Sequence, residues 1–99
     1  MWILRTEHTS NGRARTFRLL PGTIKTIGRA TRADFVVDAP LVSRIHCRLT
    51  ATDRGDLHVE DLESTNGTYV NDRRIRRATL AAGDVLRVGR VELTVSHED

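Results

Sequence analysis

The sequence predicts an all-β fold, a small sandwich or barrel, and three observations carry that prediction. Apolar residues recur mostly at every second position, which is the spacing of a strand with one buried face. Pairs of turn-forming residues, such as Asn66-Gly67 and Gly83-Asp84, separate these stretches at short intervals. No stretch keeps a helical period, so strands joined by tight turns are expected along the whole chain.

Four strands are predicted in the first half of the chain. Residues 16–20 (TFRLL) alternate and stop at a Pro-Gly turn signal, and residues 23–28 (TIKTIG) form an apolar stretch that ends at a glycine. Residues 34–38 (DFVVD) are a short apolar run between two aspartates. The fourth strand is expected directly after Arg44, because apolar side chains alternate from Ile45 onward.

The second half shows the same alternation. Residues 56–62 (DLHVEDL) follow an Arg-Gly turn signal, and residues 84–89 (DVLRVG) and 91–97 (VELTVSH) form two further strands. Residues 73–82 (RRIRRATLAA) come nearest to a helical pattern. A loop or short strand is nevertheless expected there, because a Gly-Asp turn and a strand follow at once.

The alternating apolar side chains are expected to form one core. Burying one such side chain is worth roughly 1.5–3 kcal/mol, so about twenty of them can offset the chain entropy of a small sandwich. The predicted core consists of Ile3, Phe17, Leu19, Ile24, Ile27, Phe35, Val37, Ile45, Cys47, Leu49, Leu57, Val59, Leu62, Tyr69, Leu80, Val85, Leu86, Val88, Leu93 and Val95.

Length and composition indicate a single domain over residues 1–99, with 38% hydrophobic and 29% charged residues. No segment is long and apolar enough for a membrane helix, and the N-terminus lacks the features of a secretory signal, so a cytoplasmic protein is expected. The single cysteine, Cys47, excludes an internal disulfide and is expected to be a small buried side chain.

The formal net charge is +3, and only Lys25 among the 16 basic residues is a lysine. The planar guanidinium group of arginine pairs with two oxygens of a carboxylate or phosphate, so an arginine-rich surface suits an anionic ligand. A biased genomic base composition would also enrich arginine, and both explanations stay open for most of these residues.

Three short motifs lie where strands end: GR at 28–29, SRIH at 43–46 and STNGTYVN at 64–71. They combine a guanidinium group, hydroxyl groups, an amide and permissive glycines, which are groups that bind phosphate oxygens or shape a tight loop. Each motif alone is also what an ordinary turn with capping hydroxyl groups looks like.

In this order, and with a predicted strand pair between the second and third, the motifs closely resemble the forkhead-associated (FHA) domain. The resemblance runs from about Ile24 to Val95. It implies a two-sheet β-sandwich of about eleven short strands, with the loops at one end forming the binding surface. It also implies a non-catalytic module that recognises phosphothreonine in partner proteins and so mediates phosphorylation-dependent interactions in Ser/Thr kinase signalling.

The resemblance also assigns roles to individual residues. The residues that match phosphopeptide-binding positions are Arg29, Ser43, Arg44, Thr65 and Asn66. The residues that match supporting positions in the loops are Gly28, His46 and Gly67. The resemblance also implies a pocket for the third residue after the phosphothreonine. The segments expected to line it are Leu41-Val42 and residues 28–34, where Arg32 would favour an acidic residue at that peptide position.

Two alternatives are binding modes without phosphothreonine. The cluster Arg73, Arg74, Arg76 and Arg77 could follow the phosphate backbone of a nucleic acid. Few aromatic residues are present for base stacking, which argues against a nucleic-acid partner. The fold could also serve as a scaffold that binds partners without phosphate; the full set of matched residues argues against this.

An enzyme built from Ser43, His46 and Asp61 is the remaining alternative. In an extended chain, side chains three positions apart point to opposite faces, so a bond between the hydroxyl group and the imidazole is not expected. The chain has no nucleophile elbow, zinc-protease motif or nucleotide-binding loop, and its four histidines are dispersed. No catalytic residues, metal site or cofactor are therefore predicted.

Overall fold

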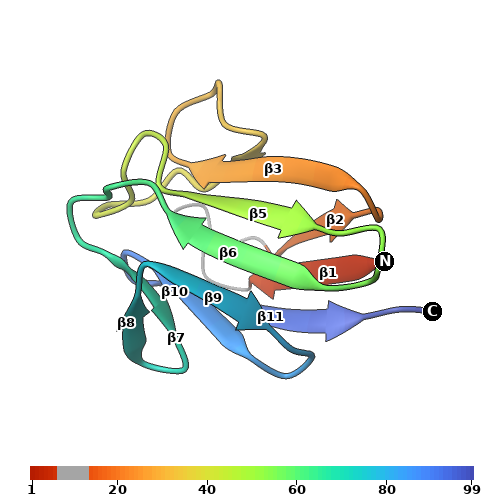
Figure 1. Ribbon diagram of the computed structural model, residues 1–99. Helices are drawn as coiled ribbons and strands as arrows, with labels where there is room; N and C mark the ends of the chain where they lie inside the picture. Colours follow the sequence, from red (N-terminus) through yellow and green to blue (C-terminus); the bar gives the residue numbers. More distant parts are fainter. Residues whose placement is uncertain (7–13) are drawn as a thin grey trace.

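The structure is a computed structural model that describes residues 1–6 and 14–99, and that part of the chain contains eleven strands and no helix (Figure 1). No helix in it could therefore cross a membrane. The strands are β1 (Trp2–Thr6), β2 (Arg15–Leu19), β3 (Thr23–Gly28), β4 (Phe35–Val36), β5 (Cys47–Ala51), β6 (Leu57–Asp61), β7 (Thr68–Val70), β8 (Arg73–Ile75), β9 (Arg77–Leu80), β10 (Val85–Val88) and β11 (Val91–His97).

The strands form two sheets that pack face to face. One sheet has the order β2-β1-β11-β10-β7-β8, and the other has the order β4-β3-β5-β6-β9. Neighbouring strands in the described part of the chain are antiparallel except β3 and β4, which are parallel. The predicted all-β sandwich is thus confirmed, and residues 73–82 form two short strands, one in each sheet.

The core lies between the sheets. Its fully buried side chains come from both layers and include Leu4, Leu19, Ile27, Leu49, Leu57, Leu86 and Leu93. Cys47 is buried there as expected, and burial raises the pKa of its thiol, which keeps the thiol protonated.

Five predicted core residues are wrong, because they are neither buried in the core nor packed against it: Ile24, Ile45, Leu62, Tyr69 and Val85. Ile24 is 60% exposed, because it pairs with Thr50 on the outer face of its sheet, whereas Ile27 is fully buried. Since strand side chains alternate, two positions three apart cannot both face the core. Leu4, Val42, Val70 and Val91 are buried but were not predicted.

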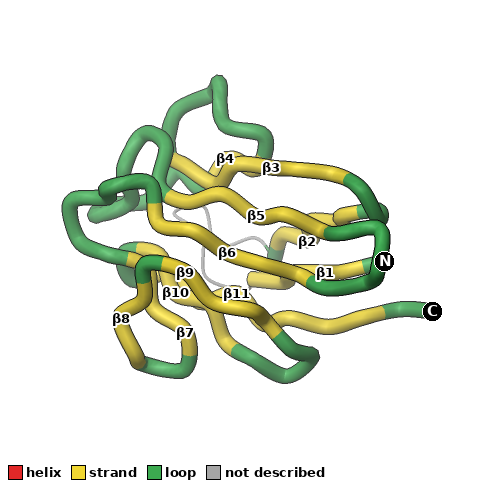
Figure 2. Tube along the Cα trace, viewed as in Figure 1, coloured by secondary structure: helices red, strands yellow, loops and turns green. Residues whose placement is uncertain are grey.

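The chain ends and the predicted binding loops lie at opposite ends of the sandwich. β1 pairs with β11, and the N-terminal amine donates to the Glu98 carbonyl over 2.7 Å. Loops after β3, β4 and β6 gather at the other end, on the left of Figures 1 and 2. The fold therefore brings all three sequence motifs to one end.

Candidate functional site

Gly28 closes β3 where the strand passes the segment that leads into β5. A Cβ atom at this position would lie 2.0 Å from the Arg44 carbonyl oxygen, so only glycine fits. The next two backbone amides continue the pairing, because Arg29 donates to Ser43 over 2.9 Å and Ala30 donates to Arg44 over 3.1 Å. The first two motifs are therefore joined along their backbones.

The Arg29 side chain is anchored by one of its nitrogens. Its Nε donates to the Val42 carbonyl over 3.0 Å, while the residue as a whole remains exposed. No ion pair in the described part of the chain involves the guanidinium groups of Arg29, Arg32 or Arg44. Arg29 is thus held in one place with its charge unmatched.

Ser43 connects the second motif to the third. Its hydroxyl oxygen accepts a hydrogen bond from the Thr65 amide over 3.0 Å, which leaves the hydroxyl proton available to another acceptor. The Asn66 side-chain amide reaches the same segment and donates to the Leu41 carbonyl over 3.1 Å. Two loops from different parts of the sequence therefore form one surface.

His46 is fully buried beneath this surface and bridges the same two loops. Its Nδ1 accepts from the Ser43 amide over 3.0 Å, so its Nε2 carries the proton and donates to the Gly67 carbonyl over 2.8 Å. Burial lowers the pKa of His46 below its ordinary 6.5, outweighing the opposite effects of the Gly67 bond and the Asp61 charge. The neutral imidazole is the form that satisfies both bonds.

Ser43 and His46 interact, but not as a nucleophile and a base. The chain bends between them, which the extended-strand prediction missed, and the contact uses the Ser43 amide instead of its hydroxyl group. The hydroxyl oxygen is bonded to Thr65.

Asp61, at the end of β6, organises the third motif. One of its carboxylate oxygens accepts from the hydroxyl groups of Ser64 (2.6 Å) and Thr68 (2.7 Å), and the other accepts from the Ser64 amide (3.3 Å). Burial raises the pKa of Asp61, but these hydrogen bonds together outweigh it, and the pKa lies below 3.8. The turn is completed by Gly67, whose φ of 89° suits glycine and whose amide donates to the Ser64 hydroxyl over 2.9 Å.

An open hollow of about 790 Å³ lies between the loops that follow β3, β4 and β6. All five predicted phosphopeptide-binding residues line it, namely Arg29, Ser43, Arg44, Thr65 and Asn66. It is also lined by Arg32, Pro40, Leu41, Val42, Ile45 and Glu63. Three guanidinium groups and one carboxylate leave a formal excess of two positive charges, so this hollow attracts an anion.

Sequence reasoning missed two contributors. The sequence suggests Asp61 only as part of a catalytic group, although its spacing of three residues before Ser64 is a common signal for a side chain that caps a turn. Glu63 also lines the hollow, and nothing in the local sequence shows that it would reach this position.

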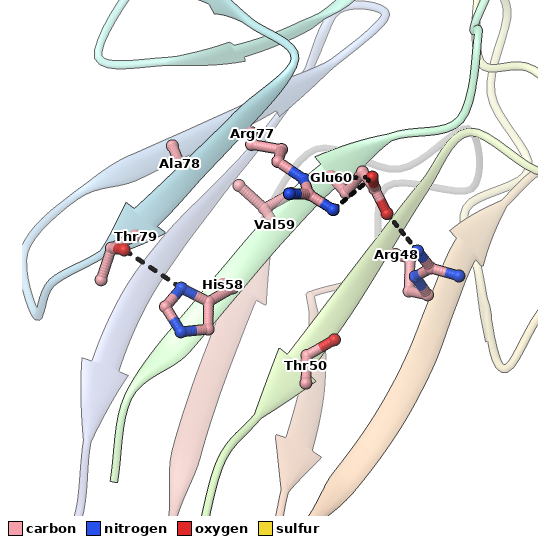
Figure 3. Close-up of a pocket in the computed structure, with 8 residues that line it drawn as sticks. All are labelled: Arg48, Thr50, His58, Val59, Glu60, Arg77, Ala78 and Thr79. Atoms are coloured by element: carbon pink, nitrogen blue, oxygen red, sulfur yellow. Dashed lines mark hydrogen bonds and ion pairs between the residues drawn. The ribbon is translucent and has the colours of Figure 1, made fainter. Parts of the chain in front are cut away.

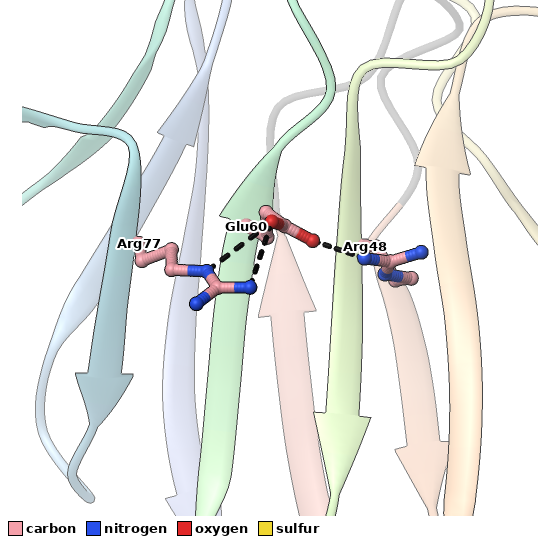
Figure 4. A network of polar contacts seen from close by, with 3 residues as sticks. All are labelled: Arg48, Glu60 and Arg77. Atoms are coloured by element: carbon pink, nitrogen blue, oxygen red, sulfur yellow. Dashed lines mark hydrogen bonds and ion pairs between the residues drawn. The ribbon is translucent and has the colours of Figure 1, made fainter.

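A second hollow, of about 550 Å³, lies on the outer face of β5, β6 and β9 (Figure 3). Both of its arginines are ion-paired, since Glu60 pairs with Arg48 on one side and with Arg77, at 3.2 Å, on the other, and the three groups leave a formal excess of one positive charge (Figure 4). The hydrogen bond from Arg48, with the charges of both arginines, lowers the pKa of Glu60. His58 lies 3.0 Å from the Thr79 hydroxyl oxygen. Because both arginines here are ion-paired, this face offers less unmatched charge to a ligand than the hollow between the loops.

The aromatic rings do not form a stacking platform for nucleic-acid bases. Phe17 and Phe35 stack on each other with centroids 4.5 Å apart, and Trp2 packs edge-on against His97. Arg87 covers the Tyr69 ring at 4.1 Å. All four Phe, Trp and Tyr side chains of the sequence are thus engaged within the protein, which weakens the nucleic-acid alternative.

Comparison with known proteins agrees with this geometry. The family model described as the FHA domain matches residues 25–89, a range that contains all three motifs. The chain is 38% identical over 90 residues to the FHA domain-containing protein FhaA of Mycobacterium tuberculosis, covering 91% of this chain and 17% of that protein. It is 41% identical over 78 residues to an ABC transporter ATP-binding/permease protein of the same organism, covering 79% of this chain and 9% of that protein.

The chain therefore spans less than a fifth of the length of either relative. Among solved structures, it is similar to an FHA domain from a structural and functional analysis of phosphothreonine-dependent FHA domain interactions. That similarity has a TM-score of 0.83 and 34% sequence identity, and covers 99% of this chain and 97% of the other.

Proposed function

The chain belongs to the FHA domain family, and we propose that it is a non-catalytic module that binds phosphothreonine in a partner protein. The observation that carries this proposal is the hollow between the three loops, where the unmatched charges of Arg29 and Arg44 lie beside the hydroxyl group of Ser43. Similarity to an FHA domain studied for its phosphothreonine-dependent interactions supports the same ligand.

The proposed mechanism rests on charge and on preformed hydrogen-bond geometry. A phosphothreonine brings about −1.5 to −2 charges and three acceptor oxygens. Arg29 and Arg44 would offset that charge through short, charge-assisted bonds, and the free proton of the Ser43 hydroxyl would donate to a third position. Because Arg29 and Ser43 are already held by neighbouring backbone groups, little ordering is needed on binding.

Thr65 and Asn66 would hold the peptide next to the phosphate. The Asn66 amide nitrogen is bonded to the Leu41 carbonyl, so its side-chain oxygen is the group available to accept from a peptide amide. Gly28, His46 and Gly67 would act indirectly, since they join the loops and do not line the hollow.

Titration calorimetry with one peptide in phosphorylated and unphosphorylated form tests the proposal. We expect measurable binding only for the phosphorylated peptide, and equal binding of both forms would contradict the proposal.

Arg29→Ala is expected to reduce affinity for the phosphorylated peptide by about 10- to 100-fold or more, as for the loss of a charge-assisted bond, with the melting temperature nearly unchanged. Arg54→Ala is the matched control, because Arg54 is an exposed arginine outside the hollow, in the turn between β5 and β6.

We further propose a cytoplasmic location, since protein phosphorylation draws on ATP and the partner would be phosphorylated by a Ser/Thr kinase.

Nucleic acid is the second candidate ligand, based on the exposed residues Arg73, Arg74 and Arg76. A gel shift at physiological salt separates the two. Tight binding that survives Arg29→Ala but is lost when these three arginines are replaced would favour nucleic acid.

A further inference from the structure

Glu63 lies in a backbone conformation that is unusual for its residue type. In the described part of the chain, four residues other than glycine have positive φ: Leu41, Glu63, Asn71 and Asp72. Asn71 and Asp72 form the two-residue turn between β7 and β8, where this conformation is expected and these residue types are favoured. Leu41 and Glu63 have no such explanation, and both line the hollow of the proposed phosphothreonine site.

The neighbours of Glu63 hold its backbone at a φ of 56°. On one side the Leu62 amide donates to the His46 carbonyl over 3.0 Å. On the other side both the amide and the hydroxyl group of Ser64 are bonded to Asp61. Glycine would occupy this position with less strain, so the chain places a carboxylate there at an energetic cost.

The carboxylate also has the wrong charge for a phosphate. Among the described residues, Glu63 is the single acidic residue that lines the hollow and takes part in no ion pair, although three arginines line the same hollow. On its own it weakens the attraction of a phosphate to this surface. A cationic group brought by the ligand would reverse that penalty.

We propose that Glu63 is a specificity-determining residue that selects partner peptides with a lysine or arginine close to the phosphothreonine. The inference rests on the proposed function and names the class of partner for the same site. The ligand would then carry both charges, with its phosphate on the arginines and its basic side chain on Glu63. A rim charge of this kind acts more on choice of partner than on total affinity.

The test uses an oriented phosphothreonine peptide library with degenerate positions on both sides of the phosphothreonine. We expect enrichment of lysine and arginine at one flanking position. Calorimetry with matched peptides should then show about a two- to fivefold advantage of arginine over alanine there, which is the range of an exposed ion pair. Glu63→Gly should remove the advantage while phosphopeptide binding persists, and Glu63→Lys should reverse it in favour of acidic residues.

Asp72→Gly is the matched control, since it also removes a carboxylate from a residue with positive φ, at a turn outside the hollow. It should leave the basic preference intact. Phosphopeptide binding without a basic preference, or a preference that survives both Glu63 substitutions, would overturn this inference and leave the proposed function standing. Failure of all phosphopeptides to bind would overturn both.

Discussion

His46 shows how one buried side chain can hold two loops in register. Its imidazole accepts from the Ser43 amide and donates to the Gly67 carbonyl, which lie in the second and third motifs. The Ser43 contact needs the neutral ring, because a protonated Nδ1 would meet the Ser43 N–H group, whereas the Gly67 carbonyl can accept from Nε2 in either form. These contacts support the structural role predicted for His46 from the resemblance, and they make the loops sensitive to acid.

The free energy of unfolding should therefore fall as the pH is lowered below about 6.5. In that range the unfolded chain gains a proton on His46, while the folded chain, whose pKa is lower, does not. The loss ends once the pH falls below the folded-state pKa, and above 6.5 this residue contributes no pH dependence. Urea unfolding measured across this range checks the prediction.

His46→Gln supplies the comparison. It should destabilise the protein by about 1–3 kcal/mol at neutral pH, the cost of leaving buried partners unsatisfied, and should remove the His46 part of the pH dependence. His58→Gln is the matched control for the substitution itself, because it changes an exposed imidazole on the outer sheet face that lies away from the loops. A parent profile that His46→Gln does not alter would show that this imidazole is not responsible.

At the scale of elements, the site is made where β3 and the segment before β5 approach each other. Gly28 permits this approach, and the amides of Arg29 and Ala30 then pair with the carbonyls of Ser43 and Arg44. The position of Arg29 is thus a consequence of strand geometry more than of its own side-chain contacts.

Gly28→Ala is expected to push the two segments apart, because its Cβ would overlap the Arg44 backbone, which cannot move alone. We expect a loss of about 1–3 kcal/mol in the free energy of unfolding, as for overpacking of a buried site, together with weaker phosphopeptide binding. Chemical denaturation and calorimetry on the same variant measure the two effects.

Gly55→Ala is the control for Gly28→Ala. Gly55 has positive φ and open space around it, so alanine there should cost stability through its backbone conformation alone. Its phosphopeptide affinity should match that of the parent. Equal affinities for all three proteins would mean that the close approach at Gly28 does not position the binding groups.

At the scale of the whole molecule, the core depends on strands outside the range that matches the family model. That range ends before β11 and begins after β1 and β2. These three strands are half of one sheet and carry the fully buried Leu4, Leu19 and Leu93. The two sheets thus need residues from both ends of the chain.

A fragment of residues 25–89 is therefore expected not to fold alone, although it contains every proposed binding residue. Without half of one sheet, the facing sheet would expose its apolar side. Circular dichroism and the dispersion of amide NMR signals compare the fragment with the full chain. A folded, phosphopeptide-binding fragment would show that the terminal strands are dispensable.

Much of the architecture is readable from the sequence, because alternation and turn residues are local signals. The strands β2, β3, β6, β10 and β11 lie within or close to their predicted ranges. Ile24 was wrongly predicted to be buried, because apolar residues on both faces of a strand do not show which face meets the core. The sequence predicts β8 and β9 only as one ambiguous segment, residues 73–82. The two strands belong to different sheets, and nothing in the local sequence shows that the chain passes from one sheet to the other between them.

The sequence by itself determined the all-β class and, through the order of its three motifs, the family and the residues to consider for phosphate. Only the tertiary structure decided that Arg29, Ser43 and Thr65 share one hollow, that His46 joins the loops beneath it, and that Glu63 lies on its rim. The reason is physical. Strand alternation depends on neighbours in the chain, whereas the charge balance of a site depends on which distant residues the two sheets bring together.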